Sequence, residues 1–279
     1  MSMGTRQDAR RTEGIDQPPL LEISRLDSTL VLTLARPEAR NSLSEALIEA
    51  LQLAIDNASQ DAAIRAVVIA AKGSVFSAGH DLKEITARRG DIDGGRAFTK
   101  LLMHQSSKLM RSIIQCPKPV IAAVEGTATA AGCQLVASCD LAVASEKAEF
   151  GAPGVDIGLF CSTPMVALSR NVPRKQAMQM LLLGERLAAR DALTYGLVNK
   201  VVSAGKAMEG ALEMTRVIAS KPAVTLAIGK EAFYRQLEMS LADAYDYAAG
   251  VMVENMMHAE SKEGIGAFIE KRDPDWTKT

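Results

Sequence analysis

Two stretches of small residues, Ser77 to Leu82 and Thr127 to Cys133, have the composition of loops that present backbone amides to a ligand. Each follows a short apolar run typical of a buried strand and leads into a helical pattern. The first amides of a helix have no partner within it, and small side chains let a ligand approach them. Two amides that converge on one oxygen would form an oxyanion hole. Close packing of strand against helix explains the same small residues, so spacing alone leaves both interpretations open.

His80 lies within the first of these stretches and is one of only three histidines. Its imidazole titrates near neutral pH, so it could act as a base or contact the ligand. Packing, or shaping of the ligand pocket, is the alternative role for this ring. The other two histidines, His104 and His258, lie in helical segments and are interpreted as ordinary helix residues.

The composition argues against metal, nucleic-acid and membrane functions. The four cysteines form no CxxC pair and have no histidine at zinc-ligand spacing, so no metal site is predicted. The formal net charge of -1 disfavours general nucleic-acid binding. No apolar run approaches the ~18 residues of a membrane span. Buried thiols in a reducing compartment are the expected state of Cys116, Cys133, Cys139 and Cys161.

The N-terminal segment, Met1 to Pro19, balances three arginines with three acidic residues. Neither a secretory signal nor an acid-poor transit peptide has this composition. We therefore expect a disordered, solvated tail and a cytoplasmic location.

Predicted strands crowd the first half of the chain and lead to both small-residue stretches. Leu21 to Arg25 and Leu30 to Leu34 form a predicted hairpin around an Asp-Ser turn. Ala66 to Ala71 and Val120 to Val124 are short apolar runs bounded by breakers, which predicts two buried strands.

Helical patterns separate these strands and dominate the second half. Ser44 is the predicted N-cap of an amphipathic helix, and a long helix is predicted from Ala97 to Gln115. Arg88 to Gly95, polar and glycine-rich, is predicted to be a mobile surface loop. From Pro173 onward the pattern is helical to the end. The sequence thus predicts an α/β core with a helical C-terminal part, without a Rossmann or P-loop signature.

Several motifs occur in one order along the chain, and together they resemble the enoyl-CoA hydratase/isomerase, or crotonase, superfamily. The similarity runs from about Leu21 to the C-terminus. It implies an α/β, crotonase-like fold with a tail at residues 1–19, a core of repeated ββα units at 20–205, and a helical trimerisation region at 206–279. The motifs are ARPEARNSLS (Ala35 to Ser44), VFSAGHDLKE (Val75 to Glu84), PVIAAVEGTATAAGCQLVASCDLAVASEKAEFGAP (Pro119 to Pro153) and GLVNKVV (Gly196 to Val202).

The resemblance implies a coenzyme A thioester as ligand, with no separate cofactor and no metal, in a homotrimer or a dimer of trimers. Motif matching assigns the oxyanion amides to His80 and Ala131. It places the next three residues of the first loop along the CoA, namely Asp81, Leu82 and Lys83.

The C-terminal segment also contains positions that match the family. Phe268 and Lys271 match residues that approach the CoA nucleotide, from the same subunit or a neighbouring one. A lysine suits the phosphates of that nucleotide. A solvated charge near the chain end explains Lys271 equally well.

Two positions depart from the family pattern. A hydratase of this family has a glutamate in the helix after the second loop and another just after the xxFGxP turn, where this chain has Gln134 and Gly154. Glutamine cannot take a proton from water at neutral pH, and glycine has no side chain. Because each positioned acid or base contributes roughly 10²- to 10⁴-fold, we expect standard hydration to be very slow. Asp156 is a possible substitute base, with a turn-capping carboxylate as the alternative.

Two functions therefore stay open. The first is an enzyme of fatty-acid or acyl-CoA metabolism, a lyase or isomerase by family, with weak or altered chemistry such as thioester hydrolysis. The second is a non-catalytic acyl-CoA-binding or regulatory protein that has kept the thioester site. Both need intact amide loops, and the missing glutamates favour the second.

Overall fold

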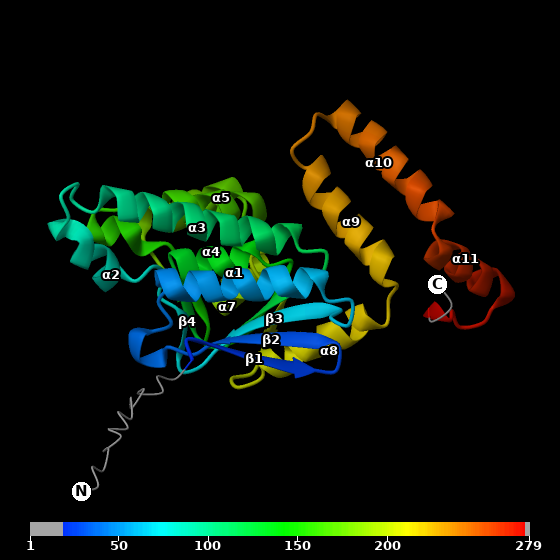
Figure 1. The fold of residues 1–279 in the computed structure, drawn as a ribbon, viewed down its shortest axis with the longest axis horizontal. Coiled ribbons are helices and arrows are strands. Elements are labelled where there is room, and N and C mark those ends of the chain that lie inside the picture. The colour runs from blue at the N-terminus through cyan, green and yellow to red at the C-terminus, as the bar shows by residue number, and fades with distance from the viewer. Residues whose placement is uncertain (1–18, 277–279) are drawn as a thin grey trace, which may run out of the picture.

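The structure, a computed structural model, describes residues 19–276 of the chain. Two β-sheets and the helices that cover them form a layered core, and helices near the C-terminal end project from it (Figure 1). The tail predicted for residues 1–19 lies outside the described residues, apart from Pro19. Between residues 19 and 276, none of the helices combines the length and apolar character that crossing a bilayer requires.

The larger sheet contains the strands that the apolar runs predicted. Its order within the described residues is β1-β2-β3-β5-β7-β10, and only the β1–β2 hairpin is antiparallel. The predicted hairpin and the two predicted buried strands, β3 and β5, are confirmed. The bounds are β1 Leu21–Leu26, β2 Thr29–Leu34, β3 Ala66–Ala71, β5 Val120–Val124, β7 Leu141–Ser145 and β10 Lys200–Val202.

A smaller sheet has the order β4-β6-β8-β9 among the residues described. Its second strand, β6 (Thr127–Thr129), lies in the stretch that the sequence predicted as loop. The prediction was wrong there because these three small residues form a strand only by pairing with β4, a tertiary contact that their local sequence does not indicate. The other strands are β4 Val75–Ser77, β8 Glu149–Gly151 and β9 Leu187–Ala188.

Strand pairs alternate with helices along the first part of the chain, which confirms the repeated ββα units. The hairpin β1–β2 leads to α1 (Glu45–Gln60), and β3–β4 leads through α2 (Leu82–Ala87) to α3 (Arg96–Gln115). In the same way β5–β6 leads to α4 (Ala131–Ser138). Ser44 caps α1 as predicted, its hydroxyl accepting a hydrogen bond of 3.3 Å from the Leu47 amide.

Helices cover the larger sheet on both faces (Figure 1). On one face α8 (Ala207–Ala219) packs its alanines against alternate residues of the central strands. On the other face the buried sides of α1 and α3 complete the main core. Of the loop predicted at 88–95, residues 88–90 form a short 3₁₀ helix, and all but Gly95 are exposed. The remaining core helices are α5 Ser162–Asn171, α6 Arg174–Leu183 and α7 Ala189–Thr194.

The projecting helices α9 (Ala223–Gln236), α10 (Leu241–Met257) and α11 (Ala259–Glu270) are called the arm below. Neither α9 nor α10 buries a residue fully in the single chain. Large apolar side chains lie exposed along both of them. Those on α10 are Leu241, Tyr245, Met252, Val253, Met256 and Met257.

A buried ion pair fastens the arm to the core. Lys230 of α9 contacts Asp140, which follows α4, at 2.6 Å, and donates to the carbonyls of Ile113 and Lys118 at 3.0 Å. Tyr234 donates to the other oxygen of Asp140 at 2.9 Å. Burial raises the pKa of the Asp140 carboxyl, although Lys230 and these hydrogen bonds stabilise its charged form.

Loss of the Lys230 ammonium should destabilise the protein strongly. The variant Lys230→Met keeps most of the side chain but leaves Asp140 buried without its counter-charge, which typically costs about 3–5 kcal/mol. Urea denaturation of both proteins measures this difference in the free energy of unfolding. The matched variant Lys206→Met breaks a solvent-exposed pair with Glu209 and should unfold like the parent. Equal midpoints for all three proteins would contradict a fastening role for Lys230.

Candidate functional site

The two small-residue stretches predicted to present amides lie in direct contact. A methyl group added at Gly79 would come within 2.9 Å of the Ala130 Cβ and 3.2 Å of the Ala131 nitrogen. One added at Gly132 would come within 2.3 Å of the Ser77 carbonyl oxygen. Real Cβ atoms do not approach backbone this closely, so only glycine allows the loops to meet. The pairing of β4 with β6 sets this contact.

The amides of His80 and Ala131 stand at the centre of this contact. Within residues 19–276 neither amide donates a hydrogen bond to a protein acceptor. Their neighbours do, because Asp81 donates to the Leu43 carbonyl at 3.1 Å and Ala130 to the Gly151 carbonyl at 2.9 Å. The backbone is therefore fixed beside each free amide. Both amides thus lack an acceptor among the described residues.

Ala130 has a strained backbone directly before the second free amide. Its φ is 50° and its ψ is -121°, a conformation that only glycine adopts freely. Such strain costs about 1–3 kcal/mol and persists only where the surrounding structure enforces it. Here the contact with Gly79 and the hydrogen bond to Gly151 maintain the strained conformation of Ala130. This conformation fixes the orientation of the Ala131 amide, the first of α4.

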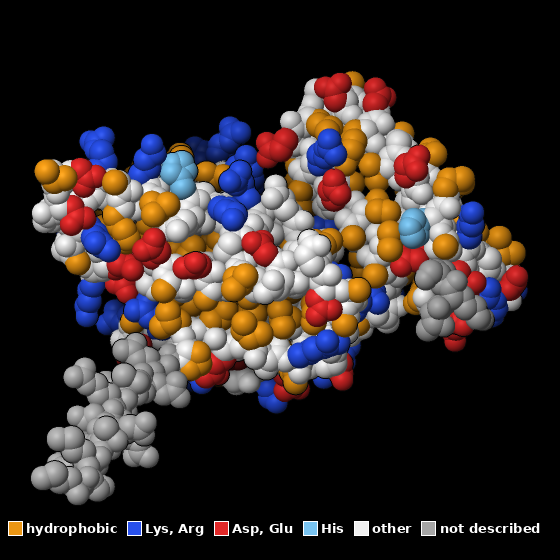
Figure 2. Space-filling model, in the orientation of Figure 1, with side chains coloured by type: hydrophobic (Ala, Val, Ile, Leu, Met, Phe, Trp, Pro, Cys, Tyr) orange, Lys and Arg blue, Asp and Glu red, His pale blue; other side chains and the backbone are white. Residues whose placement is uncertain are grey.

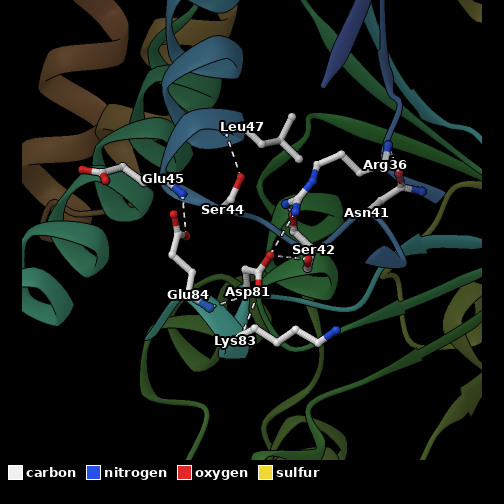
Figure 3. A network of polar contacts seen from close by, with 9 residues as sticks. All are labelled: Arg36, Asn41, Ser42, Ser44, Glu45, Leu47, Asp81, Lys83 and Glu84. Atoms are coloured by element: carbon white, nitrogen blue, oxygen red, sulfur yellow. Dashed lines mark hydrogen bonds and ion pairs between the residues drawn. The ribbon is translucent and has the colours of Figure 1, made fainter. Parts of the chain in front are cut away.

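A polar network holds the first loop (Figure 3). Asp81 caps α2 by accepting from the Lys83 and Glu84 amides, at 3.1 and 3.3 Å. Its other oxygen contacts Arg36 at 3.1 Å and the Ser42 hydroxyl at 3.2 Å. Burial acts to raise the pKa of Asp81, but Arg36 and these hydrogen bonds keep it below its ordinary value. The Asp81 side chain is thus occupied within the loop.

The network extends to Asn41, which the sequence analysis did not single out as a site residue. The fully buried Asn41 amide group donates to the carbonyls of Lys72 and Val75, at 2.8 and 2.7 Å, and accepts from the Arg36 amide at 2.8 Å. It therefore ties the loop before α1 to the β3–β4 turn. In the sequence, the RNSLS run inside the first motif was the signal that could have identified Asn41 as a site residue.

Leu82 and Lys83 complete the first loop, and both are exposed. The Lys83 ammonium has no ion pair among the described residues. Their predicted place along a CoA molecule stays a prediction.

The His80 ring lies largely buried behind its own free amide. Its Nε2 is fully enclosed, without a hydrogen-bond partner in the described part of the chain. Desolvation lowers the pKa of His80 from 6.5 to about 4, so the ring is neutral at physiological pH. A neutral imidazole can donate or accept a hydrogen bond, and it can act as a base.

Gln134 lies one helical turn beyond Ala131 in α4 and is 4% exposed. Its Oε1 is buried without a partner among the residues described. Buried polar atoms are almost always satisfied, so an orphaned one indicates a water or ligand atom that completes it. Gln134 thus supplies a buried amide acceptor without proton-transfer capacity. Its correspondence with the first glutamate of the family stays a prediction.

Gly154 has no room for a side chain. A Cβ there would lie 2.4 Å from the Leu159 carbonyl oxygen and 2.8 Å from the Cys161 sulfur. The Leu159 amide donates to the Gly154 carbonyl at 2.9 Å, which closes this turn over the position. The space that a side chain would need at this position is therefore filled. Its correspondence with the second glutamate of the family stays a prediction.

Asp156 lies within this turn, between Gly154 and Leu159, and is exposed. Its carboxylate lies beside Gly184 at the end of α6, where an added Cβ would be 3.0 Å from it. Among the described residues no hydrogen bond or ion pair joins it to either amide loop. This location favours the turn carboxylate over the substitute base.

Phe268 and Lys271 lie on the arm, at the far side of the molecule from α2 (Figure 1). Both are exposed, and the chain does not bring them to its own amide loops. A contact with a CoA nucleotide through these residues would require a neighbouring subunit.

The four cysteines are free and buried, as predicted. The sulfur of Cys161 lies over Gly154 and accepts a hydrogen bond from the Gly154 amide. Burial raises the pKa of its thiol, which disfavours the reactive thiolate.

A cavity of about 1300 Å³ lies elsewhere among the described residues. It lies between α9 and the core and is lined by residues such as Ala137, Asn171 and Ala227, with neither amide loop in its wall. We therefore locate the candidate site by its free amides and unsatisfied polar atoms. We attribute the cavity between α9 and the core to the incomplete packing of α9.

Known proteins resemble the chain over nearly its whole length. A family model described as enoyl-CoA hydratase/isomerase matches residues 25–279. The rat protein named enoyl-CoA hydratase domain-containing protein 3, mitochondrial, is 44% identical over 261 residues, which are 94% of this chain and 85% of the rat protein.

Solved structures agree with this similarity. An enoyl-CoA hydratase from Mycobacterium smegmatis, 47% identical, covers 93% of this chain and 100% of its own, with a TM-score of 0.89. Human enoyl coenzyme A hydratase domain-containing protein 3, 44% identical, covers 92% and 100%, with a TM-score of 0.88. The predicted crotonase-like fold is confirmed.

The predicted cytoplasmic location is wrong by this comparison. The rat, Xenopus laevis and human relatives are each named as mitochondrial proteins. Four unpaired cysteines indicate a reducing compartment, and they do not distinguish one such compartment from another.

A methyl group at position 154 should destabilise the protein. Gly154→Ala places a Cβ against backbone that is already hydrogen-bonded, and overpacking of this kind costs about 1–3 kcal/mol. Thermal unfolding measures the loss. Gly90→Ala is the control, because its added Cβ meets nothing within 4 Å. A Gly154→Ala protein as stable as Gly90→Ala would mean that the turn over position 154 is open.

His80 should make stability depend on pH. Because its folded pKa is about 4 against 6.5 unfolded, the unfolded chain takes up a proton first as the pH falls. Stability should therefore be complete above pH 6.5 and be lost toward pH 4, by up to ~3 kcal/mol. Denaturant titrations across this range should give a shallower slope for His80→Gln than for the parent. Identical slopes would show that the ring is solvated.

Proposed function

The chain belongs to the enoyl-CoA hydratase/isomerase family, and from that premise we propose that it binds a fatty acyl-CoA thioester. The thioester oxygen accepts hydrogen bonds from the His80 and Ala131 amides. The protein serves fatty-acid or acyl-CoA metabolism and does not perform standard hydration.

One observation carries this proposal: two backbone amides, without protein acceptors in the described part of the chain, stand on loops that glycine alone allows to touch. An ordinary exposed turn would not require glycines that let two loops touch. Each donor in such a pair typically contributes ~3 kcal/mol to the stabilisation of a developing oxyanion. The strain at Ala130 supports the same role, because it is maintained beside the amide that the ligand would use.

The lack of a general acid and a general base at the two family positions limits the reaction that this site can perform. Hydration of a 2-enoyl thioester needs a group that takes a proton from water and a group that returns one to carbon. At the two family positions this chain offers an amide oxygen, Gln134, and a filled space, Gly154. Binding and polarisation of the thioester are retained without the proton transfers that complete hydration.

Thioester hydrolysis, or a related altered reaction, is the second candidate. The observation that favours it is the enclosed and unpartnered His80 Nε2. As a neutral base, the ring would take a proton from a water that attacks the thioester carbon, while the free amides stabilise the oxyanion.

Assembly completes the ligand site in this proposal. The exposed apolar faces of the arm are the surface through which copies form a homotrimer or a dimer of trimers. In that assembly Phe268 and Lys271 approach the CoA nucleotide of a neighbouring subunit, with the lysine near its phosphates. Lys83 does so from the first loop.

Calorimetric titration with saturated and 2-enoyl-CoA thioesters of several lengths tests the proposed function. We expect saturable binding by the parent protein, with hydration undetectable in parallel assays. Gly79→Ala should weaken binding about 100-fold, because its Cβ would push the amide loops apart. Gly90→Ala should bind like the parent.

The assay also separates the two candidates. Release of free CoA that disappears in His80→Gln, with binding intact, would establish the hydrolytic reaction. Rapid hydration by the parent, or binding that is indifferent to Gly79→Ala, would contradict the proposal.

A further inference from the structure

The first amide loop carries a largely buried carboxylate beside the amide that the proposed ligand needs. Asp81 directly follows His80, and its side chain is only 14% exposed. Its Oδ1 caps α2 by accepting hydrogen bonds from the Lys83 and Glu84 amides. Burial acts to raise the pKa of Asp81, but the hydrogen bond from Arg36 helps to hold it below its ordinary value. A full negative charge therefore lies one residue from the His80 amide at neutral pH.

Other acidic side chains gather around the same loop. Glu84 of α2 accepts a hydrogen bond of 3.0 Å from the Glu45 amide at the start of α1. Figure 2 shows acidic side chains at the junction of α1 with α2. Among the described residues neither Glu45 nor Glu84 forms an ion pair. These carboxylates therefore add to the negative charge beside the loop.

Arg36 is the cation that offsets Asp81. Its Nη2 contacts the Asp81 Oδ2 at 3.1 Å, and its side chain is 18% exposed (Figure 3). The Ser42 hydroxyl donates to the same oxygen at 3.2 Å but brings no charge. The Lys83 side chain is exposed, so solvent screens its ammonium. Because largely buried pairs are screened much less, the Arg36 guanidinium provides most of the compensation.

The direction of the His80 amide does not depend on the Arg36 side chain. Leu43 pairs with the backbone on both sides of His80. Its amide donates to the Gly79 carbonyl at 2.7 Å, and its carbonyl accepts from the Asp81 amide at 3.1 Å. Both bonds join backbone groups, so they persist when the side chain at position 36 changes. Loss of Arg36 would therefore alter the charge beside the amide more than the position of the amide.

We propose that Arg36 is a positioning residue of the thioester site that acts through Asp81: it cancels the carboxylate charge and so lets the His80 amide polarise the ligand carbonyl. This inference rests on the proposed function, because it concerns the thioester oxygen at that amide. Backbone N–H dipoles stabilise an oxygen that gains negative charge, whereas an uncompensated carboxylate nearby opposes the gain. Arg36 needs no contact with the ligand for this role.

The carbonyl stretch of a bound thioester measures this polarisation. A saturated acyl-CoA, isotope-labelled at the thioester carbonyl carbon, is bound to the full chain, and its infrared band is recorded. Hydrogen bonds from both amides should move the band of the parent complex to lower wavenumber than that of the free thioester. Arg36→Met should lose much of this shift and bind the thioester about 10-fold more weakly, because the Asp81 charge is then uncompensated.

Two further variants separate charge compensation from bracing of the loop. Arg36 also donates to the Ser42 carbonyl at 2.9 Å, and methionine removes that bond too. Arg36→Lys keeps the charge without the planar fork of the guanidinium. The double variant Arg36→Met/Asp81→Asn removes both charges, while asparagine keeps the cap of α2. Both should recover the parent shift. Lys200→Met, which breaks an exposed pair with Glu213, is the control and should match the parent.

A parent-like shift in Arg36→Met would overturn the inference. A shift that stays lost in Arg36→Lys and in the double variant would also overturn it, in favour of a brace that holds the loop. These two variants decide the question even where Arg36→Met does not fold. An unshifted band in the parent complex would contradict the proposed function, and this inference with it. A shifted parent band with variants in the wrong order would contradict this inference alone.

Discussion

Contact between the two glycine-containing loops is the constraint on which the candidate site depends. Gly79 lies against Ala130 and Ala131, and Gly132 lies against Ser77. Their backbones can approach because two successive ββα units place β4 and β6 side by side. The Asp81 network holds one loop, and the bond from Ala130 to Gly151 holds the other. The positions of the His80 and Ala131 amides, which have no acceptor among the described residues, therefore depend on contacts from several parts of the core.

We propose that the same core lacks the groups that would complete hydration. The buried Gln134 Oε1 has no partner among the described residues, and an amide oxygen cannot transfer a proton at neutral pH. At Gly154 the chain has folded the Leu159–Cys161 turn into the space of a side chain. A restored glutamate at 154 would therefore need a rebuilt turn as well as a new residue. This arrangement suits a protein that holds and polarises a thioester.

Local signals in the sequence predicted most of the fold. The hairpin, the buried strands, the Ser44 cap and the long helix followed from apolar periodicity and capping chemistry. Strand β6 was missed because only its tertiary partner makes it a strand. Helix α5 was missed because Pro164 interrupts its pattern, although proline is tolerated in a first turn. The amide loops were found by composition, whereas the filled space at Gly154 and the outward position of Asp156 depend on contacts that no spacing reveals.

A crystal structure of the protein with a bound saturated acyl-CoA would show where the thioester oxygen lies. We predict that it lies within about 2.7–3.1 Å of both the His80 and the Ala131 nitrogen atoms. We also predict that the Leu159–Cys161 turn stays closed over Gly154. A thioester oxygen bound away from either amide, or an acyl chain in the space beside the arm, would contradict the account.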